Sequence, residues 1–319
     1  MVVPHRPESP RTPGMRSSAD QGRVAYAMEP TSFAHATPAE LQQLLLSIFQ
    51  SPKYRPPVLP RVAVELTDLT RRPSASYDEV VSVLQKDPLI VANVMRVAQS
   101  PLYGARSPLQ SLKDAVQRLG INALRDIVWQ VVAGLRLFRV KGFTSTMERL
   151  QLHSMFVAYA ARLVATRAGI AAEHAFLCGL LHDVGISGTL IALAETEKDL
   201  VPFSGLFDAI NGMHEQAGAT MAKLWKLSPE IIAVLDQHHR FDPNRPGVPV
   251  LTALICVAEH LADDFGYGVL DGISDLNEKL DRHAPGRYDL ALKRLRLEGK
   301  DDELRIRAEE IAERLNTVM

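Results

Sequence analysis

The stretch GLLHDVGIS, residues 179–187, places an imidazole next to a carboxylate at the end of an apolar run. Histidine and aspartate are both ligands of divalent metal ions. Neighbouring residues of a helix project about 100° apart, so His182 and Asp183 reach one ion together only from a terminal or frayed turn. Gly185, two residues after the pair, suits such a turn. The pair therefore predicts either a metal clamp or a polar helix end.

Two further polar residues lie on faces that are otherwise apolar. In RLQLHSMFVAYAARLVA, helical spacing puts His153 on the face of Phe156 and Val157, so its ring should point into the core. In LTALICVAEHLADDFG, Glu259 shares a stripe with Ile255. A buried carboxylate is costly unless it receives a proton, a cation or hydrogen bonds. A metal ion would supply the cation, and an arginine or a histidine is the alternative partner.

Helical signals extend along most of the chain. Thr37 and Glu40 form a capping box before an apolar run, and Ser76 with Glu79 forms another. Gly120 closes a third helix. Helices are predicted after residue 37 and at 60–72, 76–87, 88–100, 111–120, 122–138, within 145–168, and near 172–183, 215–226, 229–239 and 249–265. Few stretches alternate apolar and polar residues, so the sequence predicts an all-α fold.

The two ends of the chain differ from the middle in composition. Residues 1–36 hold five prolines and few apolar residues, which predicts a disordered tail because such a segment cannot bury enough surface. Residues 271–319 are rich in both acidic and basic residues and carry helical stripes. They are interpreted as a helical appendage with a solvated face. The alternative is an amphipathic helix that binds a partner or a second copy of the chain.

The overall charge excludes some classes of protein. The formal net charge is −1, from 36 basic and 37 acidic residues, which leaves no basic footprint for nucleic acid or an anionic membrane. No apolar stretch is expected to reach the length of a membrane span, and the start of the chain lacks the order of a signal peptide. Cys178 and Cys256 lie in apolar runs, as reduced core cysteines do. A cytoplasmic protein is expected.

Several segments together resemble the HDOD domain, the HD-related output domain of bacterial signalling proteins. They are the VLP start, the DP before a helix, the turn SPLYG, SLKDAVQRLG, GLLHDVG and AGATMAKLWKLSPEIIAVLDQHH, spread over residues 40–265. The resemblance implies an HDOD domain at 37–270, with an N-terminal helical half at 37–140 and an HD-like half at 141–270. The HDOD family is in turn similar to the HD and HD-GYP phosphohydrolases, which are all-helical proteins that hold one to three metal ions. HDOD members are mostly regulatory outputs.

The resemblance also implies a ligand set. His153 matches the first ligand position of the HD pattern, His182 and Asp183 match the pair that names it, and Glu259 stands where an aspartate is usual. Three further histidines match the extra metal positions of the HD-GYP branch: His214, His238 and His239. Imidazole and carboxylate ligands suit Fe, Mn or Zn. The remaining histidines fit no pattern and are expected at the surface or in the tails: His5, His35, His174, His260 and His283.

Two accessories of the HD-GYP hydrolases are missing. The lysine that follows the HDxG motif there, and that helps stabilise the phosphoryl charge, is replaced by Ile186. The Gly-Tyr-Pro loop is absent, since the chain reads RFDPNRPGVPVL after the double histidine. Arg240, Arg245 or Lys226 are candidates for the missing charge. A retained structural or sensing metal site without efficient hydrolysis is therefore favoured.

Three hypotheses remain open. The first is a signalling module that binds protein partners, with a possible homo-oligomer. The second is a metal-dependent phosphohydrolase of a nucleotide or cyclic dinucleotide, in which Asp183 would be catalytic by orienting the attacking water. In that case the first four ligands would hold one ion, and the three further histidines a second. The third is a receptor that binds a nucleotide in its helical cleft without cleaving it.

Overall fold

The computed structural model describes residues 36–72, 74–104, 108–170, 174–196, 202–242, 247–269 and 286–317. Every regular element in these ranges is a helix, which confirms the predicted all-α class. The expected tail at 1–36 lies almost wholly outside the described residues, as do His5, His35 and His283.

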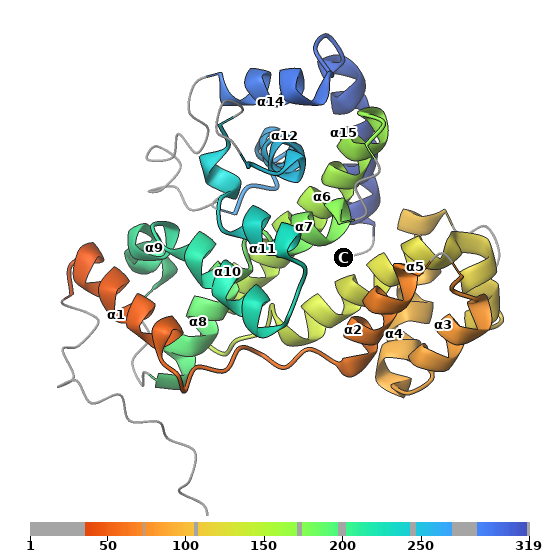
Figure 1. Ribbon diagram of the computed structural model, residues 1–319, viewed down its shortest axis with the longest axis horizontal. Helices are drawn as coiled ribbons and strands as arrows, with labels where there is room; N and C mark the ends of the chain where they lie inside the picture. The colour runs from red at the N-terminus through yellow and green to blue at the C-terminus, as the bar shows by residue number, and fades with distance from the viewer. Residues whose placement is uncertain are drawn as a thin grey trace, which may run out of the picture.

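The first helices form two groups (Figure 1). Helix α1 (Pro38–Gln50) packs against α9 (Phe203–Asn211) and α10 (His214–Leu224) of the later part of the chain. A bundle at the right of Figure 1 follows it. Its members are α2 (Arg61–Thr70), α3 (Tyr77–Leu84), α4 (Pro88–Ala98), the short 3-10 helix η2 (Pro101–Tyr103) and the long α5 (Leu112–Arg136). Helix α5 is the centre of this bundle, because α2, α3 and α4 all contact it.

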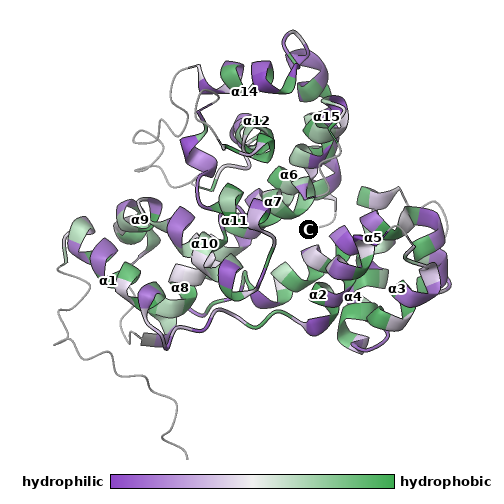
Figure 2. Ribbon diagram, viewed as in Figure 1, coloured by the Kyte–Doolittle hydropathy of each residue, from purple (hydrophilic) through white to green (hydrophobic). Residues whose placement is uncertain are grey.

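The second half of the chain surrounds the predicted ligands. Its helices are α6 (Thr144–Arg167), α7 (Ala175–Leu181), α8 (Val184–Thr196), α9 (Phe203–Asn211), α10 (His214–Leu224), α11 (Pro229–Leu235), the 3-10 helix η3 (His238–Arg240) and α12 (Val250–Asp264). Helix α6 packs against both α7 and α12, and α8 packs against α10. Apolar residues line the interior of this assembly (Figure 2).

The predicted helix starts and stops are present. Thr37 and Glu40 form a complete capping box at α1, and Ser76 with Glu79 forms another at α3. Gly120 has a φ of 82° and interrupts α5, so the two helices predicted on either side of it are separate helical runs. A residue with a side chain would be strained in that conformation.

Two helices were missed by the sequence patterns. Helix α8, VGISGTLIALAET, holds two glycines and lacks a polar stripe, and α9 is short. The interpretation of Gly185 as part of a turn is wrong, because this residue lies inside α8. A Cβ there would meet the His214 carbonyl oxygen at 1.9 Å and the Gly218 nitrogen at 2.7 Å. Gly185 therefore permits a close crossing of α8 and α10.

The expectation about apolar length also needs correction. Ala175–Glu195, which runs through α7 and α8, is 21 residues long and apolar enough to span a membrane by composition. However, 94% of its apolar window is buried inside the protein, as in a core helix. The cysteines behave as predicted, since Cys178 and Cys256 are both buried and free.

The C-terminal residues form two helices that pack onto the second half. They are α14 (Arg287–Leu295) and α15 (Asp301–Asn316), and they contact α12 and α6 respectively. Their inner faces carry buried residues such as Leu292 of α14 and Leu304 of α15, while their outer faces are polar (Figure 2). The start of the predicted appendage, up to residue 285, lies outside the described residues.

Candidate metal centre

The predicted ligands converge at one place in the second half of the molecule. His182 and Asp183 lie at the break between α7 and α8, so the expected terminal turn is present. The other side chains come from α6, α10, η3 and α12. Two groups of ligand atoms are close enough to share an ion: His153, His182 and Asp183 form one, and Asp183, His214, His238 and His239 form the other.

The first group faces one oxygen of Asp183. The Nε2 atoms of His153 and His182 are 3.0 Å apart. Each lies 3.5 Å from Asp183 Oδ2. Glu259 lies beside this group, with its Oε1 3.7 Å from His182 Nε2. Its side chain is 4% exposed, as its place on an apolar stripe predicts.

The second group faces the other oxygen of the same carboxylate. His214 Nε2 and His238 Nε2 are 3.2 Å apart, and each is 3.4 Å from Asp183 Oδ1. The His239 ring packs against both of these rings, with centroids 5.0 Å and 4.3 Å away. Asp183 therefore stands between two pairs of imidazoles.

Backbone carbonyls fix the orientation of four of these rings. His182 Nδ1 contacts Gly179 O at 2.8 Å, His214 Nδ1 contacts Asn211 O at 2.9 Å, and His238 Nδ1 contacts Leu235 O at 3.1 Å. Each carbonyl belongs to the last turn of the preceding helix, where it lacks an intrahelical donor. The fourth ring, His153, has its Nδ1 2.8 Å from Tyr267 O. Because a carbonyl only accepts, each Nδ1 must carry the hydrogen.

This arrangement leaves lone pairs pointing at lone pairs. A neutral imidazole protonated at Nδ1 presents an unprotonated Nε2, so the two close Nε2 pairs bring acceptors together. Asp183 Oδ1 is buried and has no hydrogen-bond partner among the described residues. A cation in each group would resolve both conflicts. Two ligand atoms about 2.1 Å from an ion at tetrahedral angles lie about 3.4 Å apart, which matches these separations.

Burial sets the charge states that a cation would meet. Removal from water lowers the pKa of His238 to about 3, so the ring is neutral at physiological pH. Burial on its own would raise the pKa of Asp183, but the surrounding histidines outweigh it and hold this pKa well below its usual range. His238 therefore offers a neutral imidazole and Asp183 an ionised carboxylate, the forms in which these groups bind metals.

One edge of the centre is less enclosed. The side chains of six predicted ligands are at most 4% exposed, whereas that of His239 is 21% exposed. The His239 backbone nitrogen donates to Glu215 Oε1 at 3.0 Å, and Arg240 Nε lies 3.0 Å from Glu215 Oε2. Burial raises the pKa of Glu215, opposed by these two contacts. The side chain of Arg240, which is half exposed, therefore places a guanidinium beside the His239 edge.

The other suggested replacements for the missing lysine are placed differently. Lys226 follows the far end of α10 from His214, about 15 Å along the helix at 1.5 Å per residue. Arg245 lies outside the described residues. Ile186, in the place of the lysine, is buried and apolar. Arg240 is therefore the member of the three that the structure places beside the centre.

Two of the histidines that fit no pattern can be placed. The His260 ring stacks on Tyr288 of α14 with centroids 4.1 Å apart, so it belongs to a helix interface rather than to open surface. His174 is half-buried at the start of α7. Neither belongs to the two ligand groups found among the described residues.

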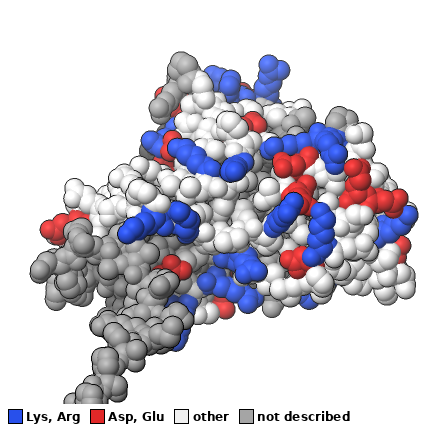
Figure 3. Space-filling view, turned by 60° about the horizontal axis from the view of Figure 1, so that its bottom comes forward, with Lys and Arg blue, Asp and Glu red and all other residues white. Residues whose placement is uncertain are grey.

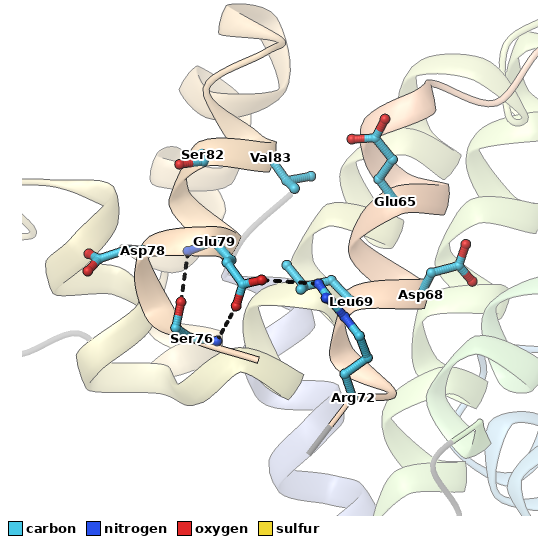
Figure 4. A pocket seen from close by; sticks show the side chains of 9 residues that line it. All are labelled: Glu65, Asp68, Leu69, Arg72, Ser76, Asp78, Glu79, Ser82 and Val83. Carbon is cyan, nitrogen blue, oxygen red and sulfur yellow. Dashed lines mark hydrogen bonds and ion pairs between the residues drawn. The ribbon is translucent and has the colours of Figure 1, made fainter. Parts of the chain in front are cut away.

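A separate surface pocket lies away from this centre. It is bounded by α2 and α3, at the opposite side of the molecule from α8 and α10 (Figures 1 and 4). Four of its nine lining residues are acidic. Arg72 pairs with Glu79 at 3.3 Å, and Glu79 also belongs to the α3 capping box. Over the same bundle, acidic and basic side chains are intermixed on the face in Figure 3. This pocket has no part in the predicted chemistry.

Some contributors to the centre carried no sequence signal. Tyr267 supplies a carbonyl across a separation of 114 residues, and Glu215 braces the loop that carries His239. Any residue type can supply a backbone carbonyl, so no sequence pattern could have identified Tyr267. Glu215 does adjoin a predicted ligand, and that adjacency is the one available hint.

The all-helical fold and the two histidine groups around a shared aspartate agree with the resemblance to the HDOD domain noted from the sequence. The sequence model of the HDOD domain matches residues 57–241, more than half of the chain, and the chain belongs to the HDOD family. The helix that carries Glu259 and the two C-terminal helices lie beyond the matched residues.

Two curated relatives match part of the chain. The chain is 27% identical over 207 residues to an uncharacterized protein of Treponema pallidum, covering 60% of this chain and 38% of that one. It is 30% identical over 201 residues to ribonuclease Y of Aquifex aeolicus, covering 58% and 32%. The matches thus span about a third of the length of these two relatives.

Two solved structures share the fold. An HDOD domain protein of unknown function from Geobacter sulfurreducens superposes with a TM-score of 0.63 at 25% identity, covering 88% of this chain and 99% of that one. A protein from Shewanella amazonensis, named as a candidate metal-dependent phosphohydrolase, gives 0.64 at 20% identity, with 87% and 99% covered.

Proposed function

We propose that this protein is a regulatory member of the HDOD family whose core binds two divalent transition-metal ions. The observation that carries the proposal is the pair of close Nε2 contacts, 3.0 Å and 3.2 Å, on opposite oxygens of Asp183. Such contacts between acceptors are unfavourable without a cation between them. The imidazole-rich donor set suits Fe, Mn or Zn.

Each ion has its own set of proposed ligands. His153, His182 and Asp183 Oδ2 would hold the first, with Glu259 at its edge. His214, His238 and Asp183 Oδ1 would hold the second, with His239 beside them. The Nδ1 contacts to carbonyls are the outer hydrogen bonds that ligating histidines usually make.

We propose further that the protein acts by binding other proteins rather than by turnover. Burial supports this, because all but one of the proposed ligand side chains are almost fully enclosed. The apolar Ile186 in place of the lysine supports it too. A centre closed in this way suits a structural or sensing ion. Signalling proteins of the cytoplasm, or a second copy of the chain, are the proposed partners.

A second candidate function is hydrolysis of a phosphodiester, in a nucleotide, a cyclic dinucleotide or RNA. Arg240 beside the partly exposed His239 is the observation that favours it, because an anion entering at this edge would meet a guanidinium. The similarity to ribonuclease Y supports the same reading. The ions would supply Lewis acidity, and Asp183 would be catalytic by orienting the attacking water.

Elemental analysis of the purified protein tests the main proposal. We expect two metal equivalents in the wild type and none in the double variant His182→Ala, Asp183→Ala, with Asp68→Ala, an exposed residue of α2, as the control. Wild-type protein that stays metal-free after loading with Mn, Fe or Zn would contradict it.

Turnover assays then separate the two functions. We expect no cleavage of cyclic di-GMP, bis-p-nitrophenyl phosphate or a short RNA by the loaded protein. Cleavage that disappears in Asp183→Ala would instead establish the phosphohydrolase. Binding of cyclic di-GMP in calorimetry, without cleavage, would indicate the receptor.

A further inference from the structure

The C-terminal helices are attached closely to the helices that carry the ligands. Arg305 of α15 pairs with Asp264 of α12 at 2.7 Å, and Tyr288 of α14 stacks on His260 of α12. The Tyr288 hydroxyl donates to Asp301, which joins α14 to the start of α15. The two helices therefore form one unit against α12 and α6, which we call the C-terminal unit, residues 286–317.

One residue of this unit reaches the metal centre. Arg287, at the start of α14, is 5% exposed, and its Nη2 donates to the carbonyl oxygen of His238. Its own carbonyl accepts from Cys256 Sγ of α12 at 3.9 Å. The His238 carbonyl belongs to the peptide that joins His238 to His239. A buried guanidinium thus holds the peptide between two proposed ligands of the second ion.

A second contact runs from the unit to the first ion's ligands. The Tyr267 hydroxyl donates to Ala312 O of α15 at 3.0 Å and lies 2.9 Å from Asn316 Oδ1. The carbonyl of the same residue accepts from His153 Nδ1 at 2.8 Å. Its ring stacks on Phe156 of α6, with centroids 4.6 Å apart. The C-terminal unit is therefore linked to both groups of histidines.

We propose that Arg287 is a positioning residue of the metal centre, through which the C-terminal unit sets the affinity for the second ion. A hydrogen bond from a charged donor is stronger than a neutral one, and outer contacts of this kind typically change metal affinity by about 10- to 100-fold. Without the guanidinium the peptide of η3 can rotate and carry both rings away from Asp183. Tyr267 has the corresponding role for the first ion. This inference rests on the proposed function.

Arg287→Met in the full-length protein tests the assignment. We expect the second of two Mn or Zn ions to bind about 10- to 100-fold more weakly in competition with a chromogenic chelator, with the first ion unchanged. Arg287→Lys should restore part of the affinity, because it keeps a charged donor. Arg294→Met, an exposed residue on the same helix, is the matched control and should leave both affinities unchanged.

A metal-free measurement separates this inference from the proposed function. In protein labelled with nitrogen-15 histidine, Arg287→Met should shift the imidazole signals of His238 and His239 and leave those of His153. If the wild type binds no metal, the proposed function fails, and these signals alone decide the positioning role. Unchanged His238 signals together with unchanged affinity would overturn it. If Arg287→Met does not fold, Arg287→Lys decides: a weaker second ion and shifted His238 signals support the positioning role, and wild-type values for both overturn it.

Discussion

Asp183 is the residue on which both groups of histidines depend. Its Oδ2 faces His153 and His182, and its Oδ1 faces His214 and His238, all between 3.4 Å and 3.5 Å. One carboxylate therefore links two imidazole pairs that come from different parts of the chain. This division makes the contribution of each histidine separable.

Single substitutions on opposite sides of Asp183 should remove single ions. We expect His153→Ala to lose the first equivalent and keep the second, and His238→Ala to do the reverse. Elemental analysis of both variants, with circular dichroism to verify their helix content, measures this. Loss of both ions from either variant would show that the two groups bind as one.

The residues of the centre show how far the sequence leads. The adjacent His182 and Asp183 and the apolar faces around His153 and Glu259 predicted burial and polarity correctly. The resemblance supplied the other histidines, since a lone histidine beside a loop predicts nothing by spacing. Tyr267 and Arg287 were not predicted, because they act through backbone carbonyls brought together by folding.

At the scale of helices, α8 and α10 cross closely at Gly185. No Cβ fits at Gly185, whereas a Cβ at Gly218 would meet its nearest neighbour at an ordinary 3.5 Å. The sequence patterns missed α8 because its glycines and continuous apolar run resemble neither an amphipathic helix nor a strand. Gly185 thus weakened the helical pattern of α8 in the sequence, and it also permits the close crossing that brings His214 to Asp183.

Gly185→Ala should therefore force these two helices apart. We expect a loss of about 1–3 kcal/mol in the free energy of unfolding, together with weaker binding of the second ion. Gly218→Ala is the control and should change both by little. Urea unfolding and metal titration of both variants measure these two effects. Equal losses of stability and of metal affinity in the two variants would contradict the tight crossing.

The junction between α5, α6 and η2 contains a chain of buried hydrogen bonds. The Tyr159 hydroxyl donates to Gln130 Oε1 at 2.8 Å and lies 2.7 Å from the Tyr103 hydroxyl, which belongs to the SPLYG turn. Because Tyr159 gives its hydrogen to Gln130, Tyr103 is the donor of the second bond.

The order of donors predicts unequal effects at this junction. Tyr159→Phe removes the donor to a buried amide oxygen and should lower the free energy of unfolding by about 1–3 kcal/mol. Tyr103→Phe removes only a donor to a hydroxyl that keeps its own bond, so its effect should be smaller. Urea unfolding of both variants tests the order, and a larger effect of Tyr103→Phe would reverse the assignment of donors.

At the scale of the whole molecule, one core joins the two halves. The buried apolar residues of the described chain form a single cluster that runs from α1 to α15. The all-α class followed from helical spacing and capping boxes. The packing of α1 onto α9 and of α15 onto α6 did not, because these contacts join segments far apart in the sequence.

Metal binding should consequently stabilise the molecule as a unit. A ligand that binds only the folded state adds about 2.7 kcal/mol to the free energy of unfolding when its free concentration is about 100 times its Kd. We expect Mn or Zn to raise the unfolding midpoint of the wild type and not that of the double variant His182→Ala, Asp183→Ala. An equal rise in both proteins would indicate ions bound elsewhere.

The histidines that follow α7, α9 and α11 also terminate those helices, because each Nδ1 contacts a carbonyl three residues earlier. These three rings are therefore oriented by the protein itself, without a bound ion. A zinc finger, by contrast, is unfolded without its metal. Ions that bind the proposed centre would therefore meet rings already positioned by the helix ends, and removing the ions should leave the helices in place.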